Sequence, residues 1–177
     1  MARDYSRFIN EVEPLLFHFA DDGDIPNNPR LPLVYYPGVI VEEDRDHARI
    51  YQEIFAVNDW PDNWRDGVYP FPHYHSDAHE VLGCYGGSAK IRLGGAGGII
   101  RLVSAGDVVV VPAGVGHENM GASAGFKVVG SYPNGQSPDL CRGGQRPAGV
   151  AATIGQVPLP KLDPIYGGGS GLTTIWA

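Results

Sequence analysis

The sequence is poor in cysteine, with only Cys84 and Cys141 among its 177 residues. Two thiols can form at most one disulfide, which excludes a scaffold held by several bridges and favours reduced cysteines. No stretch approaches the run of about 18 apolar residues that a membrane helix needs, and no apolar signal segment follows Met1. We therefore expect a cytoplasmic protein that folds around a hydrophobic core.

Positive charge is also scarce. There are 13 Lys and Arg residues against 20 Asp and Glu, the formal net charge is −7, and the basic residues form no cluster. Nucleic acids and anionic membrane surfaces attract proteins that present clustered basic residues, so neither is an expected partner. A small molecule is the expected ligand.

Glycine and proline, in contrast, are abundant, with 25 and 15 residues. Frequent turns are typical of an all-β protein built from many short strands, and this length suits one domain, 1–177. We divide it into an N-terminal arm with one helix (1–66), a strand-rich core (67–132) and a coil tail that wraps the core (133–177).

The spacing of apolar residues predicts the individual elements. One helix is expected from Asp44, its N-cap, to Asn58, because Ile50, Tyr51, Ile54 and Phe55 fall on one face. Turns or loops are expected at 21–24 and 60–67, and a hairpin tip at 94–98. Strands are expected at 14–20 along a sheet edge, and at 33–36, 90–93, 99–103, 108–111 and 126–132.

His73 and His75 are separated by one residue. Alternate side chains of a strand share a face, so the two imidazoles project together. A bend near Ser76 can bring Glu80 back toward them, and His117 is a further candidate that must arrive by folding. Imidazole and carboxylate groups suit one divalent transition metal: Fe, Mn, Ni, Co or Zn. A polar cluster without a metal is disfavoured, because burying four titratable groups without a compensating ion is costly.

The spacing around these residues matches two known motifs. The first runs Gly67, five residues, His73, one residue, His75, four residues, Glu80, six residues, Gly87; the second runs Gly106, five residues, Pro112, one residue, Gly114, two residues, His117. Both resemble the motifs of the cupin superfamily, except that Gly121 stands where the second motif usually has Asn. Further stretches, at 22–28, 132–136 and 157–164, resemble the bacterial YjlB-type cupins.

The resemblance implies a double-stranded β-helix, a jelly-roll barrel, with one metal bound at its open end. The implied ligands are His73, His75, Glu80 and His117. Cupins often dimerise through sheet edges and terminal arms, and the Pro-rich segment 25–33 forms such an extended arm. We therefore expect a homodimer.

Strand alternation predicts which neighbours face the metal. Tyr69 and Phe71 share the parity of the paired histidines, and Leu82 and Cys84 share that of Glu80. His79 has the opposite parity, points away, and is only a second-choice ligand. The same argument applied to the later strands completes the predicted pocket: Tyr69, Phe71, Leu82, Cys84, Asn119, Phe126 and Tyr132. Such a pocket suits a small, partly apolar, oxygenated substrate that chelates the metal.

Three histidines and one glutamate leave an octahedral metal two open positions. A bidentate substrate, or substrate and O₂, can occupy them, so the leading hypothesis is a metal-dependent dioxygenase, ahead of an isomerase or decarboxylase. The alternative is a non-enzymatic protein that binds a small molecule through its metal. A metal-free epimerase with a His base and a Tyr acid is a third reading, which the intact ligand set disfavours.

Overall fold

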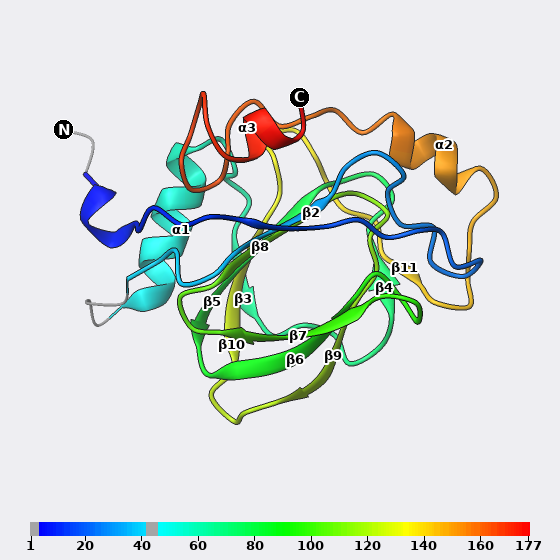
Figure 1. Ribbon diagram of the computed structural model, residues 1–177, viewed down its shortest axis with the longest axis horizontal. Helices are drawn as coiled ribbons and strands as arrows, with labels where there is room; N and C mark the ends of the chain where they lie inside the picture. Colours follow the sequence, from blue (N-terminus) through cyan, green and yellow to red (C-terminus); the bar gives the residue numbers. More distant parts are fainter. Residues whose placement is uncertain (1–3, 42–45) are drawn as a thin grey trace.

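Two antiparallel sheets form the body of the protein. The computed structural model describes residues 4–41 and 46–177 (Figure 1). One sheet has the strand order β1-β2-β8-β5-β10-β3 and the other β11-β4-β9-β6-β7. The strands are β1 (Leu15–Phe17), β2 (Leu33–Tyr36), β3 (Trp64–Asp66), β4 (His73–Tyr74), β5 (Glu80–Gly86), β6 (Ser88–Leu93), β7 (Ile99–Ser104), β8 (Val108–Val111), β9 (His117–Ala122), β10 (Lys127–Ser131) and β11 (Cys141–Arg142). The chain changes sheet after β3, β4, β5, β7, β8, β9 and β10. This repeated crossing is the double-stranded β-helix expected from the sequence.

The inner strands of the six-stranded sheet are buried on both faces. All four residues of β8 (Val108–Val111) and all four of β2 (Leu33–Tyr36) are buried, and their side chains divide between two apolar clusters. One cluster lies between the sheets, and the other lies beneath α1 and the C-terminal segment. A strand covered on both sides gains from an unbroken apolar run, which explains the four consecutive valines.

The five-stranded sheet, in contrast, leaves its outer face open to water. Burial alternates along β6, where Ala89, Ile91 and Leu93 are buried and Lys90 is exposed. On β6 the inward side chains join the core between the sheets and the outward ones are polar, whereas β7 exposes the apolar Ile100 and Leu102. The half-buried strand predicted at 90–93 is confirmed, as is the hairpin tip that joins β6 to β7.

Helix α1 (His47–Val57) confirms the predicted helix, with Ile50, Tyr51, Ile54 and Phe55 buried. Its N-cap is Asp46, whose side chain accepts a hydrogen bond from the Arg49 amide. The predicted cap, Asp44, lies outside the described residues. Two further short helices, α2 (Val150–Gly155) and α3 (Leu172–Ile175), and the 3₁₀ turn η1 (Ser6–Phe8) complete the elements. Within the described chain, no helix has the length and apolar character needed to cross a membrane.

The structure corrects two predictions of irregular backbone. The segment 60–67 contains β3 (Trp64–Asp66), which pairs with β10, because three residues are too few to show an alternating pattern. The tail after Tyr132, predicted as mostly coil, contains β11, α2 and α3. These elements run across one side of the molecule in Figure 1, and the indole of Trp176 donates to the Pro32 carbonyl at 2.9 Å.

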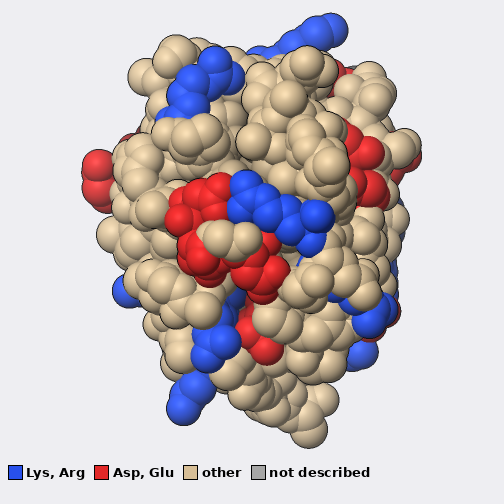
Figure 2. All heavy atoms as spheres, turned by 90° about the vertical axis from the view of Figure 1, so that its right-hand side faces the viewer, with Lys and Arg blue, Asp and Glu red and all other residues tan. Residues whose placement is uncertain are grey.

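The turn predicted at 21–24 carries three carboxylates, near a face where acidic side chains gather in Figure 2. Their oxygens hold neighbouring loops in place. Asp21 forms a two-point ion pair with Arg146, at 2.6 and 2.7 Å, Asp22 accepts from the Ala96 amide and Asp24 from the Gly144 amide. This acidic cluster therefore has a structural use.

Candidate metal centre

Three buried histidines converge between the sheets at one end of the barrel. The strand register pairs His73 on β4 directly with His117 on β9, so their rings lie 4.1 Å apart. His75 follows β4, and its ring is 6.0 Å from that of His73. One ligand atom from each histidine lies within 4.8 Å of the others. A single antiparallel pairing, between β4 and β9, therefore brings His117 next to His73 and His75.

Backbone carbonyls fix the orientation of all three rings. The Nδ1 atoms of His73, His75 and His117 hydrogen-bond the carbonyls of Phe71, Asp139 and Val115, at 3.0, 2.5 and 3.1 Å. A carbonyl can only accept, so each Nδ1 carries its proton and each Nε2 can offer a lone pair to a metal. Metal-binding histidines are commonly held in this way by a partner on the second ring nitrogen.

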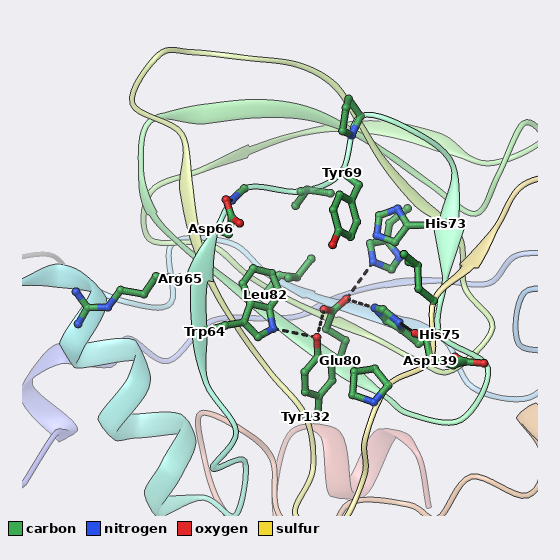
Figure 3. A pocket seen from close by; sticks show the side chains of 16 residues that line it. Trp64, Arg65, Asp66, Tyr69, His73, His75, Glu80, Leu82, Tyr132 and Asp139 are labelled. Atoms are coloured by element: carbon green, nitrogen blue, oxygen red, sulfur yellow. Dashed lines mark hydrogen bonds and ion pairs between the residues drawn. The ribbon is translucent and has the colours of Figure 1, made fainter.

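Glu80 reaches the same point from the opposite sheet. The bend at Ser76 and Asp77 returns the chain into β5, whose first residue is Glu80. Its Oε2 lies 3.0 Å from His117 Nε2 and 3.5 Å from His75 Nε2 (Figure 3). That oxygen is buried, and apart from these two imidazoles no donor reaches it from the described residues. A buried carboxylate oxygen that faces two imidazole nitrogens fits a bound cation.

The electrostatics of the cluster also favour positive charge at its centre. Burial raises the pKa of Glu80, but the neighbouring His75 and His117 outweigh burial, and the pKa lies well below its usual value. Burial lowers the pKa of His75, but the charge of Glu80 dominates and raises it to about 9. Burial and the nearby His117 lower the pKa of His73 to about 3. Without a metal, the raised pKa of His75 places a positive charge beside Glu80, and a bound cation can take its place.

A second pair of side chains holds the other oxygen of Glu80. The Tyr132 hydroxyl donates to Glu80 Oε1 at 3.3 Å, and the indole Nε1 of Trp64 donates to that hydroxyl at 2.9 Å (Figure 3). Burial and the charge of Glu80 raise the pKa of Tyr132, so the phenol keeps its proton. Glu80 is thereby oriented with Oε2 toward the histidines.

Two motif glycines shape the backbone around the ligands. Gly114 has φ +89° and donates its amide to the His75 carbonyl at 2.7 Å. Gly87 has φ +60°, and a Cβ there would lie 2.6 Å from the Phe126 nitrogen. Both positions need a left-handed backbone that side chains other than glycine adopt rarely.

A cavity of about 560 Å³ opens onto the histidines. It is lined by Trp64, Arg65, Asp66, Gly67, Val68, Tyr69, Pro70, His73, His75, Glu80, Leu82, His117, Tyr132, Pro138, Asp139 and Leu140. Of the predicted pocket residues, Tyr69, Leu82 and Tyr132 lie in this wall. Cys84 and Phe126 do face inward, but they pack in the core between the sheets and outside the lining. Strand alternation predicts which face of the sheet a side chain is on, but it does not predict how far along the barrel axis that side chain lies.

Phe71 and Asn119 also lie outside the cavity lining. Residues 67–72 form no strand, so the alternation assumed for Phe71 does not apply, and its ring stacks on Tyr69 at 4.9 Å. The amide of Asn119 donates to the Tyr69 carbonyl, and its side chain accepts from the Gly121 amide. His79, the second-choice ligand, packs against Trp176 with a ring distance of 4.9 Å, and its Nδ1 accepts from the Ala113 amide.

Sequence reasoning favoured packing of Trp64 against the helix over a place in a pocket wall, and it missed Asp139. Trp64 lies in the short strand β3, and Asp139 in the tail. Asp139 supplies the carbonyl that orients His75, and its carboxylate accepts hydrogen bonds from the amide and hydroxyl of Ser76. The pairing of tail and motif depends on tertiary structure, and no periodic pattern signals it. The two tryptophans at 60 and 64 were the one available hint of an aromatic wall.

Two comparisons place this geometry among known proteins. The profile described as "Cupin" matches residues 63–136, which include all four candidate ligands. A protein of Bacillus subtilis (strain 168), named uncharacterized protein YjlB, is 38% identical over 168 residues, 94% of this chain and 98% of that protein. The chain belongs to the cupin family.

Solved structures similar to this cupin are more distant. An uncharacterized conserved protein with a double-stranded beta-helix domain from Klebsiella pneumoniae is 14% identical, with a TM-score of 0.36 over 80% of this chain and 89% of that one. The 11S allergen of Cocos nucifera is 22% identical, with a TM-score of 0.38 over 45% of this cupin and 24% of the allergen. The family assignment rests on the profile and the Bacillus relative.

Proposed function

We propose that this cupin holds one divalent transition metal with His73, His75, Glu80 and His117 and acts on a small oxygenated metabolite as a dioxygenase-type oxidoreductase. The observation that carries the proposal is the buried Glu80 Oε2, which lies within 3.5 Å of two imidazole nitrogens whose rings are fixed by backbone carbonyls. Nothing softer than nitrogen and oxygen is offered by these four side chains, which favours Fe, Mn, Ni, Co or Zn.

A bound ion supplies Lewis acidity and, if it is iron, the means to activate O₂. The chain's own residues position the reactants. Tyr132 keeps its proton beside Glu80 and steers that carboxylate, while Leu82 and Val68 give the cavity apolar walls that limit access of water.

Oxidation is favoured over isomerisation or decarboxylation by how the other carboxylates of the wall are used. Asp66 accepts from the Gly67 amide at 2.7 Å, and Asp139 accepts from the Ser76 amide at 2.7 Å. Both are therefore engaged with backbone, whereas proton-transfer chemistry needs a base aimed at the substrate. The same arrangement also suits the alternative, a metal-dependent binding protein without turnover. A homodimer and a cytoplasmic location stay predictions.

The first test is elemental analysis of protein purified without added metal or chelator, beside the His75→Ala variant. We expect near-stoichiometric metal in the wild type and its loss in the variant, together with a lower melting temperature, because one ligand is removed. His18→Ala is the control, since His18 is an exposed imidazole outside the cluster, and it should retain the metal. Unchanged metal content in His75→Ala would rule out the ligand assignment.

The metal found then directs the search for activity. With iron, O₂ uptake is measured on panels of small diketones, phenols and thiols, and substrate-dependent uptake supports the dioxygenase. Stoichiometric zinc, nickel or manganese, or metal without turnover on any panel, would instead favour the isomerase, decarboxylase or binding alternatives.

A further inference from the structure

We propose, resting on the proposed function, that the cavity selects uncharged chelating ligands and disfavours those that carry an anionic group, such as a carboxylate, away from the chelating oxygens. The inference comes from the charges on the cavity wall. It narrows the substrate to a molecule with two adjacent oxygens for the metal and an uncharged, apolar remainder for the aromatic walls.

Arg65 is the only Lys or Arg that lines the cavity within the described chain, and its charge is engaged elsewhere. Its Nε and Nη2 donate to Gln52 Oε1 at 3.0 and 2.6 Å, and Nη1 lies 3.6 Å from Asp46 Oδ1. Figure 3 shows the guanidinium directed toward the helix and away from Glu80. A ligand carboxylate inside the cavity therefore lacks this partner.

Two other arginines of the same end of the barrel are also occupied. The guanidinium of Arg142 lies 4.1 Å from the ring centroid of Phe71, which is outside the cavity lining. Arg92 pairs with Glu118 at 3.2 Å, and neither residue lines this cavity. Neither charge is aimed at a bound ligand.

Negative groups, in contrast, stand in the wall. Glu80, Asp66 and Asp139 all line the cavity. The carboxylate of Asp139 accepts hydrogen bonds from the amide and the hydroxyl of Ser76. Away from the metal, an anionic substituent would lose water, find no free cation in the wall and face the carboxylates of Asp66 and Asp139, all of which weaken binding.

The rest of the wall suits an uncharged, flat molecule. Trp64, Tyr69 and Tyr132 contribute aromatic rings, and Leu82 and Leu140 contribute aliphatic surface. An ammonium group must also lose its water, and the carboxylates of Asp66 and Asp139, which already accept hydrogen bonds from backbone amides, offset only part of that cost. We therefore expect a neutral ligand to bind more tightly than either charged analogue.

The test compares three catechols that share one chelating pair and differ in a substituent of similar size. These are 4-methylcatechol, 3,4-dihydroxybenzoate and 3,4-dihydroxybenzylamine. Each is titrated calorimetrically into zinc-loaded protein, because zinc has no redox chemistry and binding is then measured without turnover. Affinities are divided by those for free zinc in the same buffer, which removes differences in intrinsic chelation. We expect 4-methylcatechol to bind about tenfold more tightly than either charged analogue.

A reciprocal variant tests the cause. Leu140 lines the cavity and is 44% exposed, so Leu140→Lys adds a cation to the wall at a position where the fold tolerates a long polar side chain. It should raise the affinity for 3,4-dihydroxybenzoate by about tenfold and leave that for 4-methylcatechol within about twofold. Leu140→Gln, polar but uncharged, is the matched control and should change neither.

The outcomes separate this inference from the proposed function. If the wild type binds 3,4-dihydroxybenzoate as tightly as 4-methylcatechol or more tightly, the preference for uncharged ligands is wrong, while the proposed metal centre is unaffected. Tighter binding of the benzylamine overturns that preference in favour of a cationic ligand. Zinc binding without binding of any catechol removes both the inference and the chelated substrate of the proposed function. Failure to bind zinc removes the metal centre itself.

Discussion

At the scale of single residues, the candidate metal centre depends on groups that hold the ligands as much as on the ligands. Glu80 has one oxygen held by Tyr132, at 3.3 Å, and the other free to face the histidines. Trp64 in turn holds the Tyr132 hydroxyl at 2.9 Å. A carboxylate fixed in this way loses little rotamer freedom when it binds a cation, so the hydroxyl of Tyr132 should contribute to metal affinity.

We predict that Tyr132→Phe weakens metal binding by about 10- to 100-fold, since it removes one hydroxyl and leaves the ring in place. Competition against a chromophoric chelator measures this directly. Tyr69→Phe is the matched control, because Tyr69 lines the same cavity but is 52% exposed. The metal affinity of this variant should stay within about twofold of that of the wild type. Equal losses in the two variants would mean that the Tyr132 hydroxyl has no specific role.

At the scale of elements, one buried carboxylate makes four of the hydrogen bonds that hold the C-terminal tail. Asp163 is fully buried, and its Oδ2 accepts from the Tyr36 hydroxyl at 2.6 Å and the Leu172 amide at 2.7 Å. Its Oδ1 accepts from the amides of Ile165 and Tyr166 at 2.7 and 2.8 Å. Because four donors converge on the buried Asp163, its carboxylate stabilises the packing of the tail against β2.

Asp163→Ala should therefore lower the free energy of unfolding by about 3–5 kcal/mol, because it leaves buried donors without an acceptor. Urea unfolding measures the loss, and thermolysin should cut the tail of the variant faster than that of the wild type. Asp62→Ala is the control, since Asp62 is exposed on a loop, and its unfolding midpoint should not move. A wild-type midpoint in Asp163→Ala would contradict this account of the tail.

At the scale of the whole molecule, metal binding links the two sheets, because Glu80 belongs to one and His73 and His117 to the other. A ligand that binds only the folded state stabilises it by about 4 kcal/mol at a thousandfold excess over its Kd. For a chain of this length that is roughly a 10 °C rise in melting temperature.

We predict this rise when zinc is added to metal-depleted wild type, and no rise in His75→Ala. Differential scanning calorimetry with and without the ion is the measurement. A rise of equal size in both proteins would place the stabilising ion somewhere other than the histidine cluster.

The sequence predicted the parts of the molecule that repeat a local rule. Alternation gave the half-buried strand β6, the apolar run of Val108–Val111 gave a buried strand, and motif spacing brought His73, His75 and His117 together. Parity erred for Cys84 and Phe126, because a side chain on the correct face can lie deeper than the cavity. The role of Asp139 could not be predicted, because its contact with Ser76 joins two distant segments that share no sequence pattern. The division into one domain, 1–177, stays a prediction.

The pairing of β11 with β4 has a consequence for the order in which the site is completed during synthesis. His73 lies between His117 on one neighbouring strand and Arg142 on the other. The ribosome releases the four candidate ligands first and the segment with Asp139 and β11 afterwards. A nascent chain that already contains every ligand still lacks the strand that covers β4 and the carbonyl that orients His75. Mature geometry is thus reached only once the tail has emerged and docked.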